Sequence, residues 1–238
     1  MSEYGWLLEL EHAPETHTAA FKKNEHRFQD EHVLLIDHHD SFTQIIKSYF
    51  EQLGVSVTIV QHQDTALHHL DTFKPTCLVL SPGPGSPGEA YATQVLIQKY
   101  RMHYPMLGIC LGHQCLVEAL GGRVITASEI WHGKQAVIHH HGDGLFSGLP
   151  STFLATRYHS LVVDEHDLSN DWRITAWTHD ANGRRVIMGV AHQSYPLFGV
   201  QYHPEAVLTE HGMQVLRNFL INNSHAQAFV ETQSHHVR

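Results

Sequence analysis

One cysteine of the chain has the surroundings of a nucleophile. Cys110 lies in the segment Gly108-Ile109-Cys110-Leu111-Gly112, with a glycine two residues before it and another two residues after it. This pattern is typical of a nucleophile elbow, in which the backbone turns too sharply for side chains at the flanking positions. Such a turn presents the thiol at the carboxyl end of a strand, and the N-terminus of the following helix favours a thiolate. The alternative for this segment alone is a buried structural cysteine.

A histidine and a glutamate have the spacing of a base and its support. His203 and Glu205 belong to the segment Gln201-Tyr202-His203-Pro204-Glu205, directly after an apolar run. A cysteine nucleophile needs a base for its proton, and the base needs a third group that holds its tautomer. Taken alone, His203 could be an ordinary loop histidine, since the chain has 24. Together with the elbow, the segment indicates a catalytic pair.

A third motif is rich in proline and glycine. It reads Ser81-Pro82-Gly83-Pro84-Gly85-Ser86-Pro87 and follows the apolar run 77–80. Alternating Pro and Gly predict a stiff loop whose backbone NH groups can point at one spot. An anionic tetrahedral intermediate needs two such donors. An ordinary rigid turn is the alternative.

The elements that must position these motifs alternate along the first half of the chain. Apolar runs predict strands, and three- and four-residue periodicity predicts helices between them, which together indicate βαβ units and a parallel sheet. The expected strands are 33–37, 55–60, 77–80 and 106–109, and the expected helices are 41–53, 66–71, 89–100 and 111–120. The second half predicts strands at 124–126, 136–139, 153–155, 161–163, 172–177, 186–191 and 198–201, then a helix over 209–221.

These elements predict a single α/β domain over residues 32–221. Residues 1–31 are polar and mixed, and we expect an extension of uncertain structure with one short helix around 4–10. Residues 222–238 are predicted to be a polar, frayed tail.

Composition excludes several classes of protein. The formal charge of −9 disfavours nucleic acid and anionic membranes as partners. The three cysteines do not form a disulfide framework, no apolar run reaches the roughly 20 residues of a membrane span, and no secretory signal is evident, so we expect a cytoplasmic protein. The 24 histidines include several runs without the spacing of a metal site. Composition drift explains them better than metal storage or pH sensing, and we expect neither metal nor cofactor.

Taken together, the three motifs resemble one enzyme family. In this order, SPGPGSP, GICLGHQ and QYHPE are similar to the class I (triad) glutamine amidotransferases over about residues 32–221. The resemblance implies a flavodoxin-like open, mostly parallel sheet with flanking helices. Within the family, the chain most resembles the second components of anthranilate synthase and aminodeoxychorismate synthase. Three further stretches carry that likeness: Asp40-Ser41-Phe42-Thr43, His132-Gly133-Lys134 and Arg157-Tyr158-His159-Ser160-Leu161.

The resemblance also implies roles for individual residues. Cys110 would attack the side-chain amide of L-glutamine and form a glutamyl thioester, His203 would relay the proton to the leaving ammonia, and Glu205 would orient His203. The NH groups of Gly83 and Leu111 would form an oxyanion hole. Glutamine would be held by Gly83, Pro84, Gly85, Leu111, Gln114, Ser160 and Leu161.

A partner is implied as well. Ammonia would pass to a large chorismate-binding synthase subunit, in a heterodimer or heterotetramer of folate or tryptophan biosynthesis. The expected docking rim comprises Asp40, Ser41, His132, Gly133 and Lys134. The chain departs from the family pattern at His38-His39 and at Ala206-Val207. A stand-alone γ-glutamyl hydrolase and a catalytically silent regulatory module on the same fold remain as alternatives.

Overall fold

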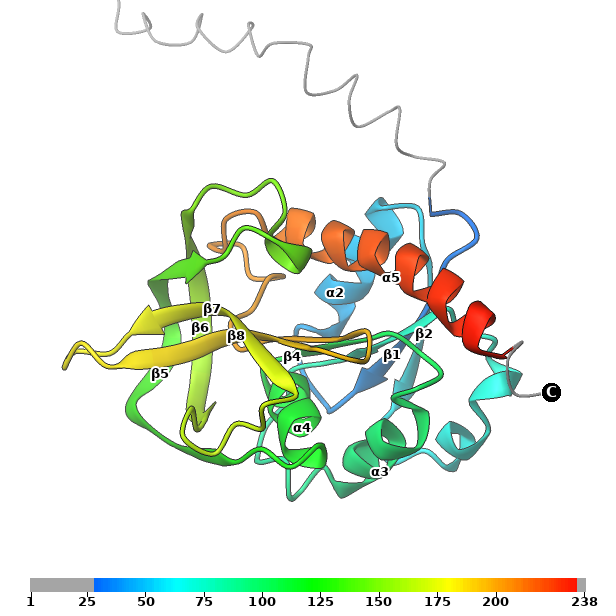
Figure 1. Cartoon of the computed structure of the whole chain (residues 1–238), viewed down its shortest axis with the longest axis horizontal. Helices are drawn as coiled ribbons and strands as arrows, with labels where there is room; N and C mark the ends of the chain where they lie inside the picture. The colour runs from blue at the N-terminus through cyan, green and yellow to red at the C-terminus, as the bar shows by residue number, and fades with distance from the viewer. Residues whose placement is uncertain (1–27, 235–238) are drawn as a thin grey trace, which may run out of the picture.

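The chain is described here by a computed structural model that covers residues 28–234 (Figure 1). The short helix expected around residues 4–10 lies outside the described residues. Within the described part, nine strands form one sheet in the order β2-β1-β3-β4-β9-β8-β7-β5-β6. The strands are β1 (His32–Asp37), β2 (Ser56–Gln61), β3 (Cys77–Leu80), β4 (Met106–Ile109), β5 (Val124–His140), β6 (Thr152–Val163), β7 (Trp172–His179), β8 (Arg185–His192) and β9 (Leu197–Val200).

Four α-helices and two short 3-10 helices accompany the sheet in the described residues. They are α2 (Thr43–Gln52), η1 (Thr65–Thr72), α3 (Tyr91–Tyr100), α4 (Leu111–Ala119), η2 (Gly144–Phe146) and α5 (Gly212–Ser234). The expected α/β fold with flanking helices is therefore confirmed. None of the helices within residues 28–234 is long and apolar enough to cross a membrane.

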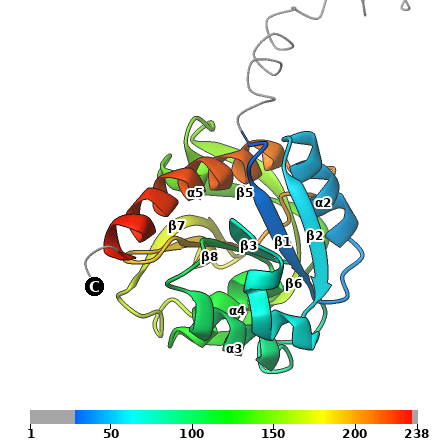
Figure 2. The same ribbon diagram turned by 90° about the vertical axis from the view of Figure 1, so that its right-hand side faces the viewer.

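The sheet is mixed. Strands β2, β1, β3, β4 and β9 pair in parallel, whereas β8, β7, β5 and β6 pair antiparallel. The strands β1, β3 and β4 are buried almost throughout, as parallel strands covered on both faces must be. Helices α2 and α5 cover one face, and α3 and α4 cover the other (Figures 1 and 2). The carboxyl ends of the parallel strands thus share one edge, which is where Cys110 lies.

The antiparallel half differs from the sequence expectation. Residues 124–163 predicted four short strands, but the structure has two long ones, β5 and β6, paired through most of their length. The register shifts between Thr126 and Trp131 and again between His132 and Lys134. Such bulges interrupt the alternation of apolar and polar residues by which a strand is recognised. The strand itself continues through the bulge, so the sequence predicted separate short strands.

The C-terminal helix is also longer than expected. The pattern predicted an end near residue 221, but α5 continues to Ser234. Asn223 is buried and its Nδ2 donates a hydrogen bond to Oε2 of Glu31 at 2.7 Å. Phe28 is also buried in the core cluster beside α2 and α5. Residues just outside the expected limits 32–221 therefore pack on the domain.

Candidate active site

Cys110 occupies a strained turn between β4 and α4. Its backbone has φ 51° and ψ −102°, a combination that costs a non-glycine residue of order 1–3 kcal/mol. The flanking glycines allow the close approach that this turn requires. A Cβ at Gly108 would lie 2.4 Å from the carbonyl oxygen of Gly112, and a Cβ at Gly112 would lie 2.3 Å from that of Leu80. The elbow geometry expected from the sequence is present.

His203 and Glu205 form a buried pair. Nδ1 of His203 donates to Oε1 of Glu205 at 2.7 Å, and both side chains are almost completely buried. The rings of Tyr158 and Phe42 meet the imidazole edge-on, with centroid distances of 5.1 and 5.5 Å. The backbone is held too, because the NH of His203 donates to the carbonyl of Thr156 at 3.0 Å. The imidazole therefore has one orientation, with Nε2 turned away from Glu205.

That ring nitrogen has no hydrogen-bond partner within residues 28–234, and Cys110 is the neighbour that acts most strongly in raising the pKa of the ring. Burial by itself would lower the pKa of His203, but the interactions with Cys110 and then with Glu205 outweigh burial and raise the pKa above its ordinary value. The arrangement favours a protonated imidazole beside the sulfur. A buried carboxylate, an imidazole and a thiol in this order can activate the sulfur as a nucleophile and return its proton to a leaving group.

A cavity of about 170 Å³ opens in front of the sulfur. Its walls come from the loop after β3, the start of α4 and the end of β6. They comprise Gly83, Pro84, Gly85, Cys110, Leu111, Gln114, Tyr158, His159, Ser160 and Leu161. All seven residues that the sequence suggested for substrate binding are thus brought to one cavity together with the cysteine. Tyr158 and His159 also line it, although sequence reasoning assigned them no role.

Gln201 is a neighbour of the sulfur that sequence reasoning missed. Its Nε2 lies 3.6 Å from Sγ of Cys110, and its Oε1 accepts a hydrogen bond from Nε2 of Gln114 at 3.0 Å. The carbonyl oxygen of Tyr158 lies 3.7 Å from the same sulfur. The only signal for Gln201 was its place in the QYHPE segment, where His203 and Glu205 carried the chemical argument.

Comparison with known proteins agrees with this geometry. The family model described as "Glutamine amidotransferase class-I" matches residues 34–223. The chain belongs to the class I glutamine amidotransferases.

This amidotransferase is similar to several curated relatives and to a solved structure. Over 188 residues it is 44% identical to aminodeoxychorismate synthase component 2 of Escherichia coli, covering 79% of this chain and 98% of the relative. Over 189 residues it is 42% identical to anthranilate synthase component 2 of Pseudomonas aeruginosa, covering 79% and 94%. The crystal structure of a putative GMP synthase protein from Thermoplasma acidophilum superimposes with a TM-score of 0.73 at 25% identity, over 86% of this chain and 98% of that one.

The proline- and glycine-rich loop of the amidotransferase is held from behind by His38. The ring of His38 contacts Ser81 through Nδ1 at 3.1 Å and Thr93 through Nε2 at 2.8 Å, and its backbone NH donates to Oγ of Ser81 at 2.9 Å. Burial lowers the pKa of His38 to about 4, so the ring stays neutral. This departure from the family pattern therefore anchors the loop that carries Gly83.

The expected docking residues lie around Tyr158 and the His203–Glu205 pair. His132 is paired with Tyr158 across β5 and β6, and their rings are 5.5 Å apart. A Cβ at Gly133, where φ is +71°, would lie 3.3 Å from the Tyr158 ring. Burial raises the pKa of Asp40, and both His203 and Glu205 act on that carboxyl. Asp40, His132 and Gly133 therefore lie next to the site, and the docking of a partner at this rim stays a prediction.

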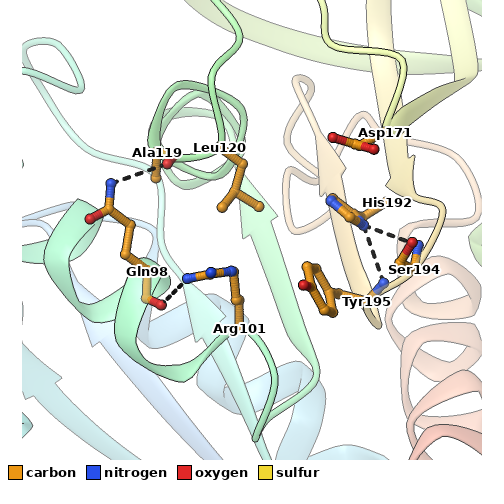
Figure 3. Close-up of a pocket in the computed structure, with 8 residues that line it drawn as sticks. All are labelled: Gln98, Arg101, Ala119, Leu120, Asp171, His192, Ser194 and Tyr195. Carbon is orange, nitrogen blue, oxygen red and sulfur yellow. Dashed lines mark hydrogen bonds between the residues drawn. The ribbon is translucent and has the colours of Figure 1, made fainter.

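Larger cavities lie elsewhere. One of about 430 Å³ lies between the C-terminal ends of α3 and α4, with Arg101, and the end of β8 and its following loop, with His192 and Tyr195 (Figure 3). Cys110 is at the opposite end of α4, roughly 13 Å away along a helix of this length. No cysteine lines this cavity. Cavity size therefore does not identify the site, whereas the nucleophile and its base do. Within residues 28–234, no three His, Cys, Asp or Glu side chains gather as metal ligands.

Proposed function

We propose that this amidotransferase hydrolyses L-glutamine to glutamate and ammonia, with Cys110 as nucleophile, His203 as base and acid, and Glu205 as the group that orients His203. One observation carries the proposal. The buried pair formed by His203 and Glu205 acts on the thiol of Cys110, which lines a cavity together with the proline- and glycine-rich loop, the start of α4 and residues 158–161 of β6.

The reaction runs in two halves. First, Sγ of Cys110 attacks the side-chain carbonyl carbon of glutamine, and an S–C bond forms while His203 holds the thiol proton. When the C–N bond breaks, His203 gives that proton to the leaving nitrogen, and ammonia departs. Water then attacks the thioester with His203 as its base, glutamate leaves, and the proton returns to the sulfur.

The negative oxygen that forms in each half needs donors. We assign this task to the backbone NH groups of Gly83 and Leu111. These two residues are in contact, since a Cβ at Gly83 would lie 3.0 Å from Cδ2 of Leu111. Removing one such donor from an enzyme typically lowers kcat by about 10²- to 10³-fold. Pro84, Gly85, Gln114, Ser160 and Leu161 would complete the glutamine site from the remaining walls.

We further propose that the ammonia passes to a large subunit that binds chorismate. The relatives at 44% and 42% identity are named as second components of aminodeoxychorismate synthase and anthranilate synthase. Both likenesses have the same extent, so the proposal covers the folate and the tryptophan branches. The product of the reconstituted pair would distinguish them.

Cys110→Ala tests the central step. With chorismate and the large subunit present, this variant should lose glutamine-dependent amination and keep amination with added ammonium, because free ammonia bypasses the thioester. Cys115→Ala is the matched control, since Cys115 is fully buried one turn along the same helix. Glutaminase activity retained by Cys110→Ala would refute the mechanism. Full glutaminase activity of the wild-type chain alone would favour the stand-alone hydrolase, and none in any assembly would favour the silent module.

A further inference from the structure

The side chain of Gln201 joins the nucleophile to the wall of the glutamine cavity. Gln201 follows β9, is fully buried, and its backbone NH donates to the carbonyl of Met188 at 3.0 Å. The backbone of Gln201 is therefore fixed beside the sulfur, and burial leaves its side chain little room to move away.

The orientation of the Gln201 side-chain amide is determined, through Gln114, by the backbone carbonyl of Leu161. Nε2 of Gln114 donates to the backbone oxygen of Leu161 at 3.0 Å, and that oxygen can only accept. The amino group of Gln114 must therefore face this way, and it also donates to Oε1 of Gln201 at 3.0 Å. With its oxygen engaged there, Gln201 must turn its own amino group toward Cys110. The direction of the contact at 3.6 Å thus follows from the network rather than from an arbitrary choice of amide orientation.

The sulfur of Cys110 therefore lies between a hydrogen-bond acceptor and a hydrogen-bond donor, which favour different protonation states of the thiol. The carbonyl of Tyr158, at 3.7 Å, can only accept and so favours the protonated thiol. The amino group of Gln201 can only donate and so favours the thiolate. His203 takes the thiol proton. The positive charge of the protonated imidazole is then partly offset by its hydrogen-bond partner Glu205, which leaves less of that charge to stabilise the thiolate.

We propose that Gln201 is a positioning residue that stabilises the thiolate of Cys110 by donating a hydrogen bond to Sγ, with its amide oriented by Gln114 and Leu161. The inference rests on Cys110 being the nucleophile of the proposed function. It adds a donor outside the Cys110, His203 and Glu205 set. Because the chain of hydrogen bonds begins at Leu161, the same network connects the substrate cavity to the reactivity of the sulfur.

Two substitutions separate the two roles of the amide. Gln201→Glu keeps an acceptor for Gln114 but replaces the donor with a carboxylate. Gln201→Met has a similar length and removes donor and acceptor without adding charge. The readout is the rate at which iodoacetamide alkylates Cys110 as a function of pH, followed by peptide mass spectrometry. Cys77 and Cys115 serve as internal controls because both are fully buried, so their alkylation would report unfolding.

We expect the midpoint of the alkylation profile to rise in both variants. In Gln201→Glu it should rise by at least about one pH unit, since a like charge then faces the thiolate. In Gln201→Met the rise should be smaller but in the same direction. An unchanged midpoint in Gln201→Met overturns the inference, even if Gln201→Glu shifts, because charge alone would then explain the shift. If Gln201→Glu fails to fold, Gln201→Met still decides. If Gln201→Met fails to fold, Gln201→Leu replaces it, because leucine also removes donor and acceptor without adding charge.

Steady-state kinetics separate a contact with the sulfur from one with Gln114 alone. The inference expects kcat for glutamine to fall in both variants. A raised KM in Gln201→Met with wild-type kcat in Gln201→Glu would show that the amide only orients Gln114, which overturns the proposal. Alkylation of Cys110 needs no glutamine, so it can be measured even if the wild-type protein shows no glutaminase activity in any assembly. In that case the proposed function would be refuted, and a raised alkylation midpoint in the Gln201 variants would still support this inference.

Discussion

Oε1 of Glu205 accepts a hydrogen bond from Nδ1 of His203, two residues before it in the chain, at 2.7 Å and out of contact with solvent. The imidazole is thereby fixed in the tautomer whose Nε2 can take a proton from Cys110. Glu205→Gln keeps the shape but removes the charge, and we expect glutaminase kcat to fall by about 10²- to 10⁴-fold. His203→Ala should be more damaging and approach the loss in Cys110→Ala, since these residues act as a unit.

The control for this comparison is Glu51→Gln, on the exposed face of α2, where the carboxylate pairs with Lys47. It should retain wild-type activity. If Glu205→Gln were as active as Glu51→Gln, the orienting role of Glu205 would have to be abandoned. Wild-type activity in His203→Ala would remove His203 as the base.

Two glycines of one loop offer a matched test of the oxyanion hole. A Cβ at Gly83 would lie 2.5 Å from Cβ of His38 and 2.9 Å from its carbonyl oxygen, so Gly83→Ala must displace the loop. At Gly88 the nearest atom would be Oγ of Ser86 at 3.9 Å, which leaves room for a methyl group. We expect Gly83→Ala to lower kcat by about 10²- to 10³-fold, as loss of one donor does.

Gly88→Ala should leave kcat and KM unchanged. The measurement is glutaminase kinetics for both variants at equal folded fraction, checked by thermal unfolding. Equal kinetics in the two variants would show that the loop carrying Gly83 does not contribute the donor.

The rim formed by Asp40, Ser41, His132, Gly133 and Lys134 is expected to bind the large subunit. Lys134 is exposed on β5 and paired in register with Arg157. Lys134→Ala should weaken association by about 3- to 10-fold, mainly through a slower on-rate, since an exposed charge contributes modestly. It should also reduce the stimulation of glutaminase by the partner.

A second variant probes His39, which directly precedes Asp40 of the rim, and leaves the loop anchor His38 unchanged. His38 is buried against Ser81, whereas His39 is exposed, so His39→Ala alone tests the surface. Lys99→Ala is the control, because Lys99 lies away from the rim. It is near the C-terminal end of α3, beside the cavity of Figure 3. Titration calorimetry with the purified large subunit measures affinity. If Lys134→Ala and His39→Ala both bind and respond like Lys99→Ala, the partner docks elsewhere.

His113 predicts an acid sensitivity of the fold. It is fully buried, neither ring nitrogen has a hydrogen-bond partner, and burial lowers its pKa to about 3. Between the ordinary pKa of 6.5 and about 3, the unfolded chain therefore binds a proton that the folded protein refuses. His113 therefore adds no protonation penalty well above pH 6.5, and below that pH the free energy of unfolding falls by up to about 1.4 kcal/mol per pH unit.

His113→Leu should remove this slope at little cost near neutral pH, because no hydrogen bond is lost. Urea unfolding at several pH values between 7.5 and 4.5 measures the difference. Burial also lowers the pKa values of His38 and His159, to about 4 and about 3, so the variant should keep part of the acid sensitivity. Identical slopes in wild type and His113→Leu would contradict the prediction.

The parallel half of the fold could be predicted from sequence because its signals are local. Each buried strand is a short apolar run, and the elbow and loop glycines lie within a few residues of the groups they serve. The path of β5 and β6 could not be predicted, since bulges near Trp131 and Gly133 erase the alternation. Nor could the contact between Gln201 and Cys110 be foreseen, because those residues are 91 positions apart and meet only when β9 pairs with β4.

The positive φ angle at Cys110 lowers the stability of the folded protein. Glycine would adopt φ 51° without the penalty that cysteine incurs there, so Cys110→Gly should unfold at a higher temperature than Cys110→Ala while both are inactive. A lineage freed from selection for glutamine chemistry would therefore gain stability by losing its nucleophile. Under the proposed function, cysteine at a position that glycine tolerates better is a loss of stability that the chain bears for catalysis.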